Sequence, residues 1–227
     1  MSENTYRYER KFLVDQLDLH QVMGLIKRHP SMFSEPFPPR FVNNFYMDTA
    51  DMEHYHDNVV GSSDRRKVRI RWYGDLMGQV ERPVLEFKIK HGLVGKKRNY
   101  PFPSFHLQSG ASLESVVPGP GTAELPKEVA DYLRTVSIVL MNSYHRRYYV
   151  SVDGKFRLTL DTGMSFYRVG GLRLARLGHR QTDHRNVVVE LKYGVDEDPL
   201  ANKVSSYFPF RVTKSSKYVQ GIDRVFL

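Results

Sequence analysis

Hydrophobic and basic side chains alternate along residues 65–73, which is the clearest pattern in this chain. Side chains of an extended strand point to opposite faces in turn, so the segment predicts a strand with one basic and one hydrophobic face. The basic face carries Lys67, Arg69, Arg71 and Tyr73, and the hydrophobic face carries Val68, Ile70 and Trp72. Like charges on one face repel each other, so this face favours an anion lying over it.

The same design recurs in segments at residues 6–12, 85–90, 156–161 and 187–192. Each places basic residues and one or two carboxylates on one face, and most place hydrophobic residues on the other. The charged faces contain Arg7, Glu9 and Lys11, then Glu86, Lys88 and Lys90, then Arg157, Thr159 and Asp161, and finally Glu190 and Lys192. One solvated strand of this kind is ordinary, but the repetition predicts a closed or strongly curved antiparallel sheet. Its charged interior would bind a polyanion, with the carboxylates holding a metal ion.

The remaining pattern predicts further strands, helices and loops, and so an α+β fold. Asp15 or Asp18 can cap a first helix that runs to about residue 29. We expect further helices at 48–58, 126–133, 198–207 and 215–226, with a weak one at 112–117. We expect strands at 41–47, 143–150, 155–161, 164–169 and 186–192, and loops at 30–39, 92–98 and 170–186.

Composition limits the class of protein and of partner. With 227 residues, 41% of them hydrophobic, the chain predicts a single domain over 1–227 with its own core. The net charge of +9 indicates an anionic partner, such as nucleic acid, an anionic membrane, or a phosphorylated molecule or polymer. The absence of cysteine excludes disulfides and thiolate metal sites, and it fits a reducing cytoplasm. The N-terminus shows no signal-peptide pattern, and no run of about 18 apolar residues predicts a membrane span.

Two patterns that resemble known sites fail on their details. Gly92-x-x-Gly95-Lys96 lacks the length and the closing Ser or Thr of a nucleotide-binding P-loop. His54 and His56 are two residues apart, which puts them on different sides of a helix, whereas helical metal ligands lie three or four apart. The basic strand faces are therefore the better candidates for chemistry.

Basic residues held on a rigid sheet suit a ligand with several phosphates. Arg binds phosphate oxygens in pairs, and Lys supplies compact positive charge. Phosphoryl transfer needs positioning, charge neutralisation and a divalent metal more than covalent chemistry from the protein. The candidate metal ligands are Glu9, Glu86, Asp161 and Glu190. Taken alone, each carboxylate is explained equally well by pairing with a neighbouring Lys or Arg.

Short segments along nearly the whole chain, in matching order, carry a family resemblance. They are Tyr8–Phe12, Arg69–Gly74, Leu85–Lys88, Tyr144–Arg147, Arg157–Asp161, Val189–Lys192 and Lys214–Gly221. Together they resemble the VTC domain, the catalytic domain of the vacuolar transporter chaperone polyphosphate polymerase, in the triphosphate tunnel metalloenzyme (CYTH-like) superfamily. Arg7 stands where the first strand of the superfamily often has a glutamate, which favours the VTC branch over the triphosphatase branch.

The resemblance implies a tunnel of antiparallel strands, a closed β-barrel with helices packed outside. It also implies Mn2+ or Mg2+ as cofactor, held by Glu190, with Glu9 as a second ligand. It assigns substrate binding to Lys11, Arg69, Arg71, Lys88, Arg146, Arg157 and Lys217, with hydroxyl contacts from Tyr144 and Ser216. Lys192 joins this set because it shares a strand face with Glu190. We expect Lys88, Arg146, Arg157 and Lys217 to be the catalytic residues.

We therefore expect a polyphosphate polymerase that transfers the γ-phosphoryl group of ATP to a growing polyphosphate chain. One alternative is a triphosphatase that hydrolyses inorganic triphosphate or nucleoside triphosphates. Another is a non-catalytic module that binds polyphosphate or RNA. The expected partners are ATP, triphosphate or polyphosphate, with no specific nucleic-acid target. We expect a cytoplasmic protein, acting alone or at the inner face of a membrane through a separate membrane partner.

Overall fold

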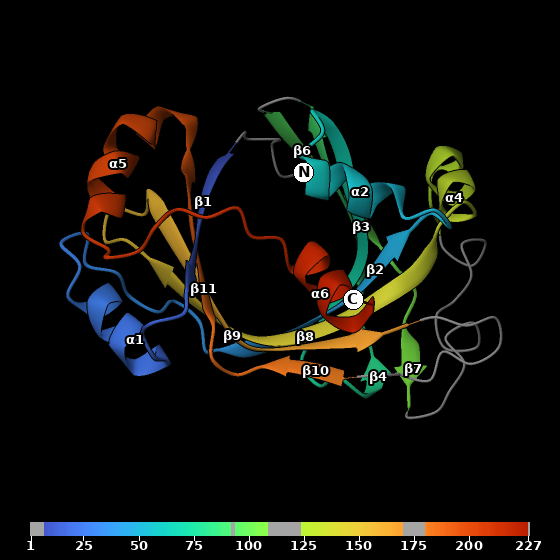
Figure 1. The fold of residues 1–227 in the computed structure, drawn as a ribbon, viewed down its shortest axis with the longest axis horizontal. Helices are drawn as coiled ribbons and strands as arrows, with labels where there is room; N and C mark the ends of the chain where they lie inside the picture. Colours follow the sequence, from blue (N-terminus) through green and yellow to red (C-terminus); the bar gives the residue numbers. More distant parts are fainter. Residues whose placement is uncertain (1–6, 92–93, 109–123, 170–179, 227) are drawn as a thin grey trace. The chain divides into compact units, whose positions relative to one another are not determined.

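A computed structural model describes residues 7–91, 94–108, 124–169 and 180–226 as an α+β fold (Figure 1). The strands are β1 (Arg7–Val14), β2 (Arg40–Asp48), β3 (Asp64–Tyr73), β4 (Gly78–Val80), β5 (Val84–His91), β6 (Val94–Pro101), β7 (Phe105–Leu107), β8 (Ser137–Val150), β9 (Phe156–Arg168), β10 (Arg180–Asp183) and β11 (Val187–Gly194). The helices are α1 (Leu19–Lys27), α2 (Glu53–Val60), α4 (Lys127–Leu133), α5 (Asp198–Ser206) and α6 (Lys217–Phe226). Within the described ranges, no helix has the length and hydrophobicity needed to cross a membrane.

Most strands belong to one antiparallel sheet. Its hydrogen-bonded order is β1-β11-β9-β8-β2-β3-β5-β6, with β10 paired to β9, while β4 and β7 form a separate pair. Among the described residues β1 and β6 do not pair, so the predicted closure into a barrel is wrong. The free edge of β1 is covered instead, because Thr213 N donates to the Lys11 carbonyl at 2.8 Å and Leu13 N donates to Thr213 Oγ1 at 3.0 Å. These two bonds occupy the β1 edge at Lys11 and Leu13, where another strand would otherwise pair.

The chain separates into two compact units. Unit 1 consists of residues 1–40, 144–164 and 182–216, and unit 2 consists of residues 41–143, 165–181 and 217–227. The long strands β8 and β9 therefore contribute residues to both units.

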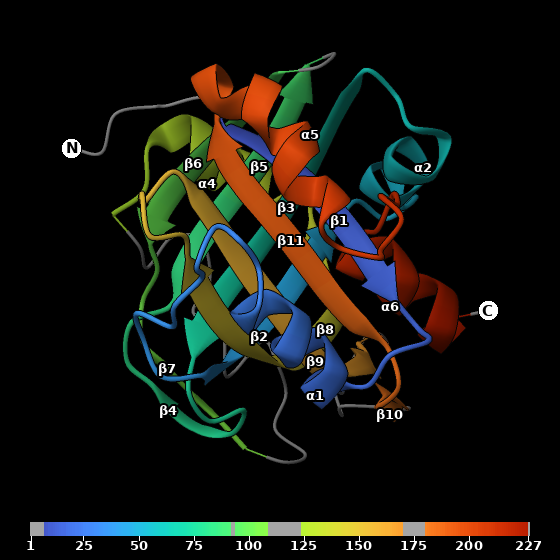
Figure 2. The ribbon, with the colours of Figure 1, turned by 90° about the vertical axis from the view of Figure 1, so that its left-hand side faces the viewer.

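The hydrophobic core of unit 1 lies between its strands and the helices α1 and α5. α1 begins at Asp18, one of the two caps predicted, because Asp18 and Gln21 each accept a hydrogen bond from the other's backbone N–H at 2.9 Å. Val22 and Ile26 of α1 are fully buried in this core, and Figure 2 shows α1 and α5 in front of β11. The strand residues that they cover include Phe12, Leu158, Leu160, Val189 and Leu191.

Unit 2 buries the hydrophobic face that was predicted for residues 65–73. Val68 and Ile70 are fully buried, and Trp72 is nearly so. The Trp72 ring packs against Phe45 and Phe105, with centroid distances of 4.8 and 5.6 Å. The prediction that β3 has one face in a core and a basic face opposite is therefore confirmed.

α6 packs on the other face of the unit 2 sheet, the face that carries Arg69 (Figure 1). The Tyr218 ring of α6 stacks on Tyr46 of β2 at 5.1 Å, and Arg69 donates to the Tyr46 hydroxyl at 3.3 Å. Gly221 permits this close approach, since a Cβ at that position would lie 2.4 Å from Leu140. Helices were predicted to pack on the outside of the barrel, away from its charged inner face. This prediction is wrong for α6, which packs on the face that carries Arg69.

Several boundaries differ from those predicted. Residues 94–98, expected in a loop, belong to β6. Their high charge suggested a loop, but these residues pair with β5 in the sheet. Residues 164–168 continue β9 rather than forming a separate strand, and β10 lies inside the loop expected at 170–186. The weak helix expected at 112–117 lies outside the described residues.

Candidate functional site

Cations and carboxylates alternate across neighbouring strands of unit 1. In the register of β1, β11 and β9, Lys11 lies opposite Glu190, which lies opposite Thr159. In the neighbouring row of the same face, Glu9 lies opposite Lys192, which lies opposite Arg157. Opposite charges in facing positions stabilise a sheet. We call Glu9, Lys11, Arg146, Asp161, Glu190 and Lys192 the unit 1 cluster.

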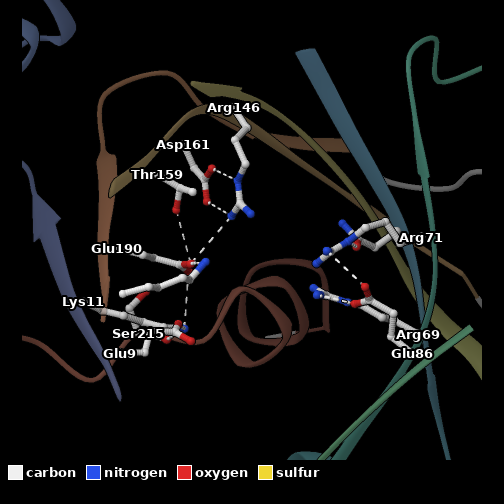
Figure 3. Close-up of polar contacts among 12 residues, drawn as sticks. Glu9, Lys11, Arg69, Arg71, Glu86, Arg146, Thr159, Asp161, Glu190 and Ser215 are labelled. Carbon is white, nitrogen blue, oxygen red and sulfur yellow. Dashed lines mark hydrogen bonds and ion pairs between the residues drawn. The ribbon is translucent and has the colours of Figure 1, made fainter. Parts of the chain in front are cut away.

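The ammonium group of Lys11 lies among oxygen atoms. Its Nζ is 3.1 Å from Glu9 Oε1 and 3.5 Å from Glu190 Oε1, and it donates to the Ser215 carbonyl at 3.2 Å (Figure 3). Two carboxylates and a carbonyl oxygen thus converge on one cation. Oxygen donors of this kind are the ligands that Mg2+ and Mn2+ prefer.

Glu190 is held from several sides by polar neighbours. Lys192 Nζ lies 2.9 Å and Arg146 Nη2 lies 3.8 Å from its Oε2, and the Thr159 hydroxyl donates to it at 3.5 Å. The Glu190 side chain is only 7% exposed. These contacts fix the carboxylate in one place and keep its charge compensated inside the protein.

Arg146 makes a bidentate ion pair with Asp161. Its Nε and Nη2 donate to the two carboxylate oxygens at 2.5 and 2.6 Å, and Asp161 is fully buried (Figure 3). Burial opposes the charge of Arg146, but Asp161 outweighs burial and raises the pKa of the guanidinium further. The guanidinium also lies 5.2 Å from the centre of the Tyr144 ring. Asp161 is held by Arg146 at both oxygens at 2.5 and 2.6 Å, whereas the contacts of Glu190 are longer, at 2.9–3.8 Å, so Asp161 is the poorer metal ligand.

A second cluster lies in unit 2 around Glu86 of β5. Arg69 Nη2 lies 2.6 Å from Glu86 Oε2, and Arg71 Nη1 lies 3.2 Å from Oε1 (Figure 3). Lys97 Nζ lies 2.7 Å from the same Oε1. Burial raises the pKa of Glu86, but Arg69 and Lys97 outweigh burial and hold it below its usual value. Arg71 is further held by Asn44, whose Oδ1 accepts from its Nε at 3.2 Å. We call Arg69, Arg71, Glu86 and Lys97 the unit 2 cluster.

Lys88 and Lys217 also belong to unit 2. In the register of β3, β5 and β6, Lys88 lies opposite Lys67 on one side and Lys97 on the other. Facing like charges destabilise a sheet, and an anion over them relieves this repulsion. Lys217 is the first residue of α6 and is buried.

The other predicted site residues lie in unit 1. Arg157 has an exposed side chain next to Lys192 in the strand register. Tyr144 is buried beside Arg146, and Ser216 lies partly buried at the end of unit 1. The structure thus gathers Lys11, Arg146, Glu9, Glu190 and Lys192 in one unit, and Arg69 and Arg71 in the other.

Some residues of these clusters were missed at the level of sequence. Lys97 was placed in a loop, although the alternation of Lys97 and Asn99 along β6 would have indicated the strand face beside Glu86. The Ser215 carbonyl that binds Lys11 has no side-chain signal at all. Tyr46, which accepts a hydrogen bond from Arg69, lies two residues after Asn44, and the segment 41–47 that was expected as this strand contains no charged residue.

A divalent metal fits the donors of the unit 1 cluster, though the chain supplies few of them. In the part of the chain that the structure describes, no three Asp, Glu or His side chains converge as a metal site. Two carboxylates, those of Glu9 and Glu190, do converge, and they meet at the amine of Lys11. Mg2+ commonly binds one or two carboxylates and takes its remaining ligands from water and phosphate. Glu190 and Glu9 therefore fit such an ion.

Comparison with solved structures identifies proteins of the same fold. A putative adenylate cyclase from Bacillus halodurans is 16% identical, with a TM-score of 0.55 over 99% of both chains. A putative adenylyl cyclase from Hippeastrum, described as having a dominant triphosphatase activity, is 15% identical, with a TM-score of 0.52 over 98% of this chain and 97% of that one. A protein from Pyrococcus horikoshii OT3 is 12% identical, with a TM-score of 0.52 over 96% of this chain and 99% of that one. At these identities the likeness shows the fold alone.

Comparison of the sequence with known proteins gives a match to a family but to no individual curated protein. A search of curated proteins finds no match. The model of the VTC domain family, in contrast, matches residues 6–226 and so includes both clusters. The family predicted from the sequence is confirmed, and the chain belongs to the VTC domain family.

Proposed function

We propose that the protein is a metal-dependent phosphotransferase that adds the γ-phosphoryl group of ATP to a growing polyphosphate chain. The observation that carries this proposal is Glu190, a buried carboxylate that contacts Lys11, Lys192 and Arg146 in a VTC domain chain. A fixed array of cations around a carboxylate suits phosphate together with a metal ion. The family match over 6–226 supports one VTC domain over residues 1–227.

In unit 1, we assign phosphate binding to the cations and hydroxyl groups near Glu190. The exposed Arg157 and the amine of Lys192 can reach a ligand directly, whereas Arg146 is held in place by Asp161 through its Nε and Nη2. Arg forks suit the oxygens of a phosphate because their donors are planar and paired. The full assigned set is Lys11, Arg146, Arg157 and Lys192, with Tyr144 and Ser216 as hydroxyl donors.

In unit 2, we assign phosphate binding to Arg69, Arg71, Lys88 and Lys217. Glu86 compensates the charge of Arg69 and Arg71 and fixes their guanidinium groups before a ligand arrives. Cations that are already ordered lose less conformational entropy when a ligand binds, so this preorganisation favours both binding and the transition state. Of all the assigned residues, Lys88, Arg146, Arg157 and Lys217 are the proposed catalytic ones, through contact with the transferred phosphoryl group.

The reaction itself asks little covalent chemistry of the protein. A terminal oxygen of the polyphosphate chain forms a bond to the γ-phosphorus, and the bond from that phosphorus to the β–γ bridging oxygen breaks. The electron pair leaves with ADP. The attacking oxygen is already anionic at neutral pH, so the protein needs no general base. Its cations instead hold both reactants and balance their negative charge.

Glu190 and Glu9 are the residues that would hold Mn2+ or Mg2+. When bound, such an ion withdraws charge from phosphate oxygens and so favours transfer. ATP as the donor, the cytoplasmic location and a separate membrane partner stay predictions.

A triphosphatase is the second candidate, and the fold comparison gives the reason to keep it. The similar Hippeastrum structure is described by a dominant triphosphatase activity. The two reactions share phosphate-binding residues and differ in the acceptor, which is water in one and polyphosphate in the other.

The products distinguish these functions. Purified protein incubated with ATP and Mn2+ should form long-chain polyphosphate, visible as a ladder on a gel. Free phosphate without polymer would assign the protein as a triphosphatase. Tight triphosphate binding with neither product would identify a binding module, and preferential RNA binding with a steep salt dependence would identify nucleic acid as the ligand.

A further inference from the structure

Asp48, at the end of β2, is a fully buried carboxylate with an unusual number of donors. The backbone N–H groups of Thr49, His54 and Tyr55 donate to it at 2.8, 2.9 and 2.9 Å. The Tyr218 hydroxyl of α6 also donates to it, at Oδ2. A buried carboxylate needs such donors, because each one replaces a hydrogen bond to water.

These contacts make Asp48 the cap of α2, although it lies well before the helix. The residue at the normal cap position, Met52, has a left-handed backbone conformation with φ of 59° and makes no side-chain cap. The N–H groups of His54 and Tyr55 in the first turn bond to Asp48 instead, and Glu53 N donates to Thr49 Oγ1 at 3.0 Å. Asp48 is therefore fixed by β2 and α2 together.

Tyr218 connects Asp48 to the basic residues of unit 2. Its ring stacks on Tyr46 at 5.1 Å, and the Tyr46 hydroxyl accepts a hydrogen bond from Arg69 Nη1 at 3.3 Å. Lys217 is the residue directly before Tyr218 and begins α6. One hydrogen bond, from Tyr218 to Asp48, thus secures both the start of α6 and the ring on which Tyr46 rests.

We propose that Asp48 and Tyr218 are positioning residues that hold Lys217 and Arg69 in the orientation that binds phosphate. The inference rests on the proposed function, because Lys217 and Arg69 have to be phosphate ligands for their orientation to affect binding. Neither Asp48 nor Tyr218 touches the substrate in this account. Their effect is to keep two cations ordered before the ligand arrives, which reduces the cost of binding.

A purely structural tie between α2 and α6 is the competing explanation, and the chain offers a matched control for it. The Tyr55 hydroxyl of α2 donates to Asp223 Oδ1 of α6 at 2.6 Å. Tyr55→Phe therefore removes a hydrogen bond between the same two helices, while the bond from Tyr218 to Asp48 remains. Tyr218→Phe removes the hydroxyl and keeps the ring that stacks on Tyr46.

The test is the affinity for inorganic triphosphate of the full chain and of both variants, measured by calorimetry beside the thermal stability of each. We expect Tyr218→Phe to weaken binding about tenfold, since a hydrogen bond to a charged group orders both cations. We expect Tyr55→Phe to bind within about twofold of the unmodified protein at a similar loss of stability. Equal affinities for the two variants would overturn the inference.

Tyr46→Phe provides a second route to the same answer if Tyr218→Phe does not fold. It removes the acceptor for Arg69 and keeps the ring stack, so it should also weaken triphosphate binding, and unchanged binding would overturn the inference. Combined with Tyr218→Phe, it should cost less than the two single effects together, because both act on Arg69. If the unmodified protein fails to bind triphosphate, the proposed function falls and this inference falls with it. If the unmodified protein binds triphosphate and Tyr218→Phe binds it equally well, this inference is overturned and the proposed function stands.

Discussion

Arg146 and Asp161 form a fully paired, buried ion pair, with the guanidinium donating to both carboxylate oxygens at 2.5 and 2.6 Å. Arg146 also lies 3.8 Å from Glu190, so the same side chain belongs to the proposed phosphate site. Arg146 therefore has a structural role and a binding role, and its substitution affects both. This double role decides how its variants have to be compared.

Arg146→Ala should destabilise the protein and remove phosphate binding. The substitution leaves Asp161 charged, buried and unpaired, which costs about 3–5 kcal/mol in the free energy of unfolding. The double variant Arg146→Ala with Asp161→Asn should recover much of that stability, because position 161 no longer carries an unpaired charge, and it should not recover binding. Urea unfolding and triphosphate calorimetry measure the two effects. Binding restored in the double variant would show that Arg146 acts only on stability.

Glu190→Gln should abolish the effect of Mn2+ on triphosphate binding. The unmodified protein should bind triphosphate more tightly with Mn2+ than without it, since Glu190 is the proposed metal ligand. Without metal, the variant should bind about fivefold more tightly than the unmodified protein, because a carboxylate that repels the ligand is gone. Calorimetry with and without Mn2+ gives both numbers.

Glu86→Gln is the matched control for that experiment, because it removes the same charge from the unit 2 cluster. Without metal it loses a carboxylate that repels the ligand but also the ion pairs that order Arg69 and Arg71, so its affinity should change less than that of Glu190→Gln; it should keep the full enhancement by Mn2+. Loss of the enhancement in both variants would mean that Mn2+ acts through the net charge of the protein rather than through Glu190.

Glu86 should make stability depend on pH in the acidic range. Burial raises its pKa, but Arg69 and Lys97 outweigh burial and hold it below the usual value of 4.5. Between the folded pKa and about 4.5 the unfolded chain binds more protons than the folded one, so stability falls as the pH is lowered through this range. The stability difference between the protein and Glu86→Gln should be largest at neutral pH and should shrink below about 4.5. Urea unfolding across this range measures it, and a constant difference would contradict the assigned pairing.

Gly221→Ala should destabilise unit 2 by about 1–3 kcal/mol, as overpacking of a tight core does. A Cβ at Gly221 would lie 2.4 Å from Leu140 Cδ2 and 2.7 Å from Phe166 Cδ1. Gly24→Ala in α1 is the control, because its nearest neighbour would be the tip of Arg28 at 3.8 Å. That change should stabilise the protein by about 0.5–1 kcal/mol, since alanine favours a helix more than glycine. Thermal unfolding should therefore shift in opposite directions, and a shift in the same direction would contradict the packing of α6.

The face on which each charged residue lies could be predicted from sequence, because side-chain direction along a strand is a local property. Val68, Ile70 and Trp72 are buried as expected, and Arg69 and Arg71 lie on the opposite face with Glu86. The cap of α1 at Asp18 is likewise local, since it depends on residues three apart.

The partner of each charged residue could not be predicted, because it depends on strand order and register. Asp161 was a candidate metal ligand and instead binds Arg146 with both oxygens. Lys97 was expected in a loop and instead pairs with Glu86. The open end of the sheet at β1 also depends on a distant segment, since Thr213 covers the strand edge that closure into a barrel requires.

The most direct test of the proposed function is the balance of phosphate during turnover of ATP by the purified protein with Mn2+. ADP, free phosphate and acid-insoluble polyphosphate should be measured in the same time course, for the protein and for Glu190→Gln. We predict one phosphate incorporated into polymer for each ADP released, little free phosphate, and no polymer from the variant. Release of free phosphate equal to ADP, with no polymer, would contradict the polymerase and leave a triphosphatase.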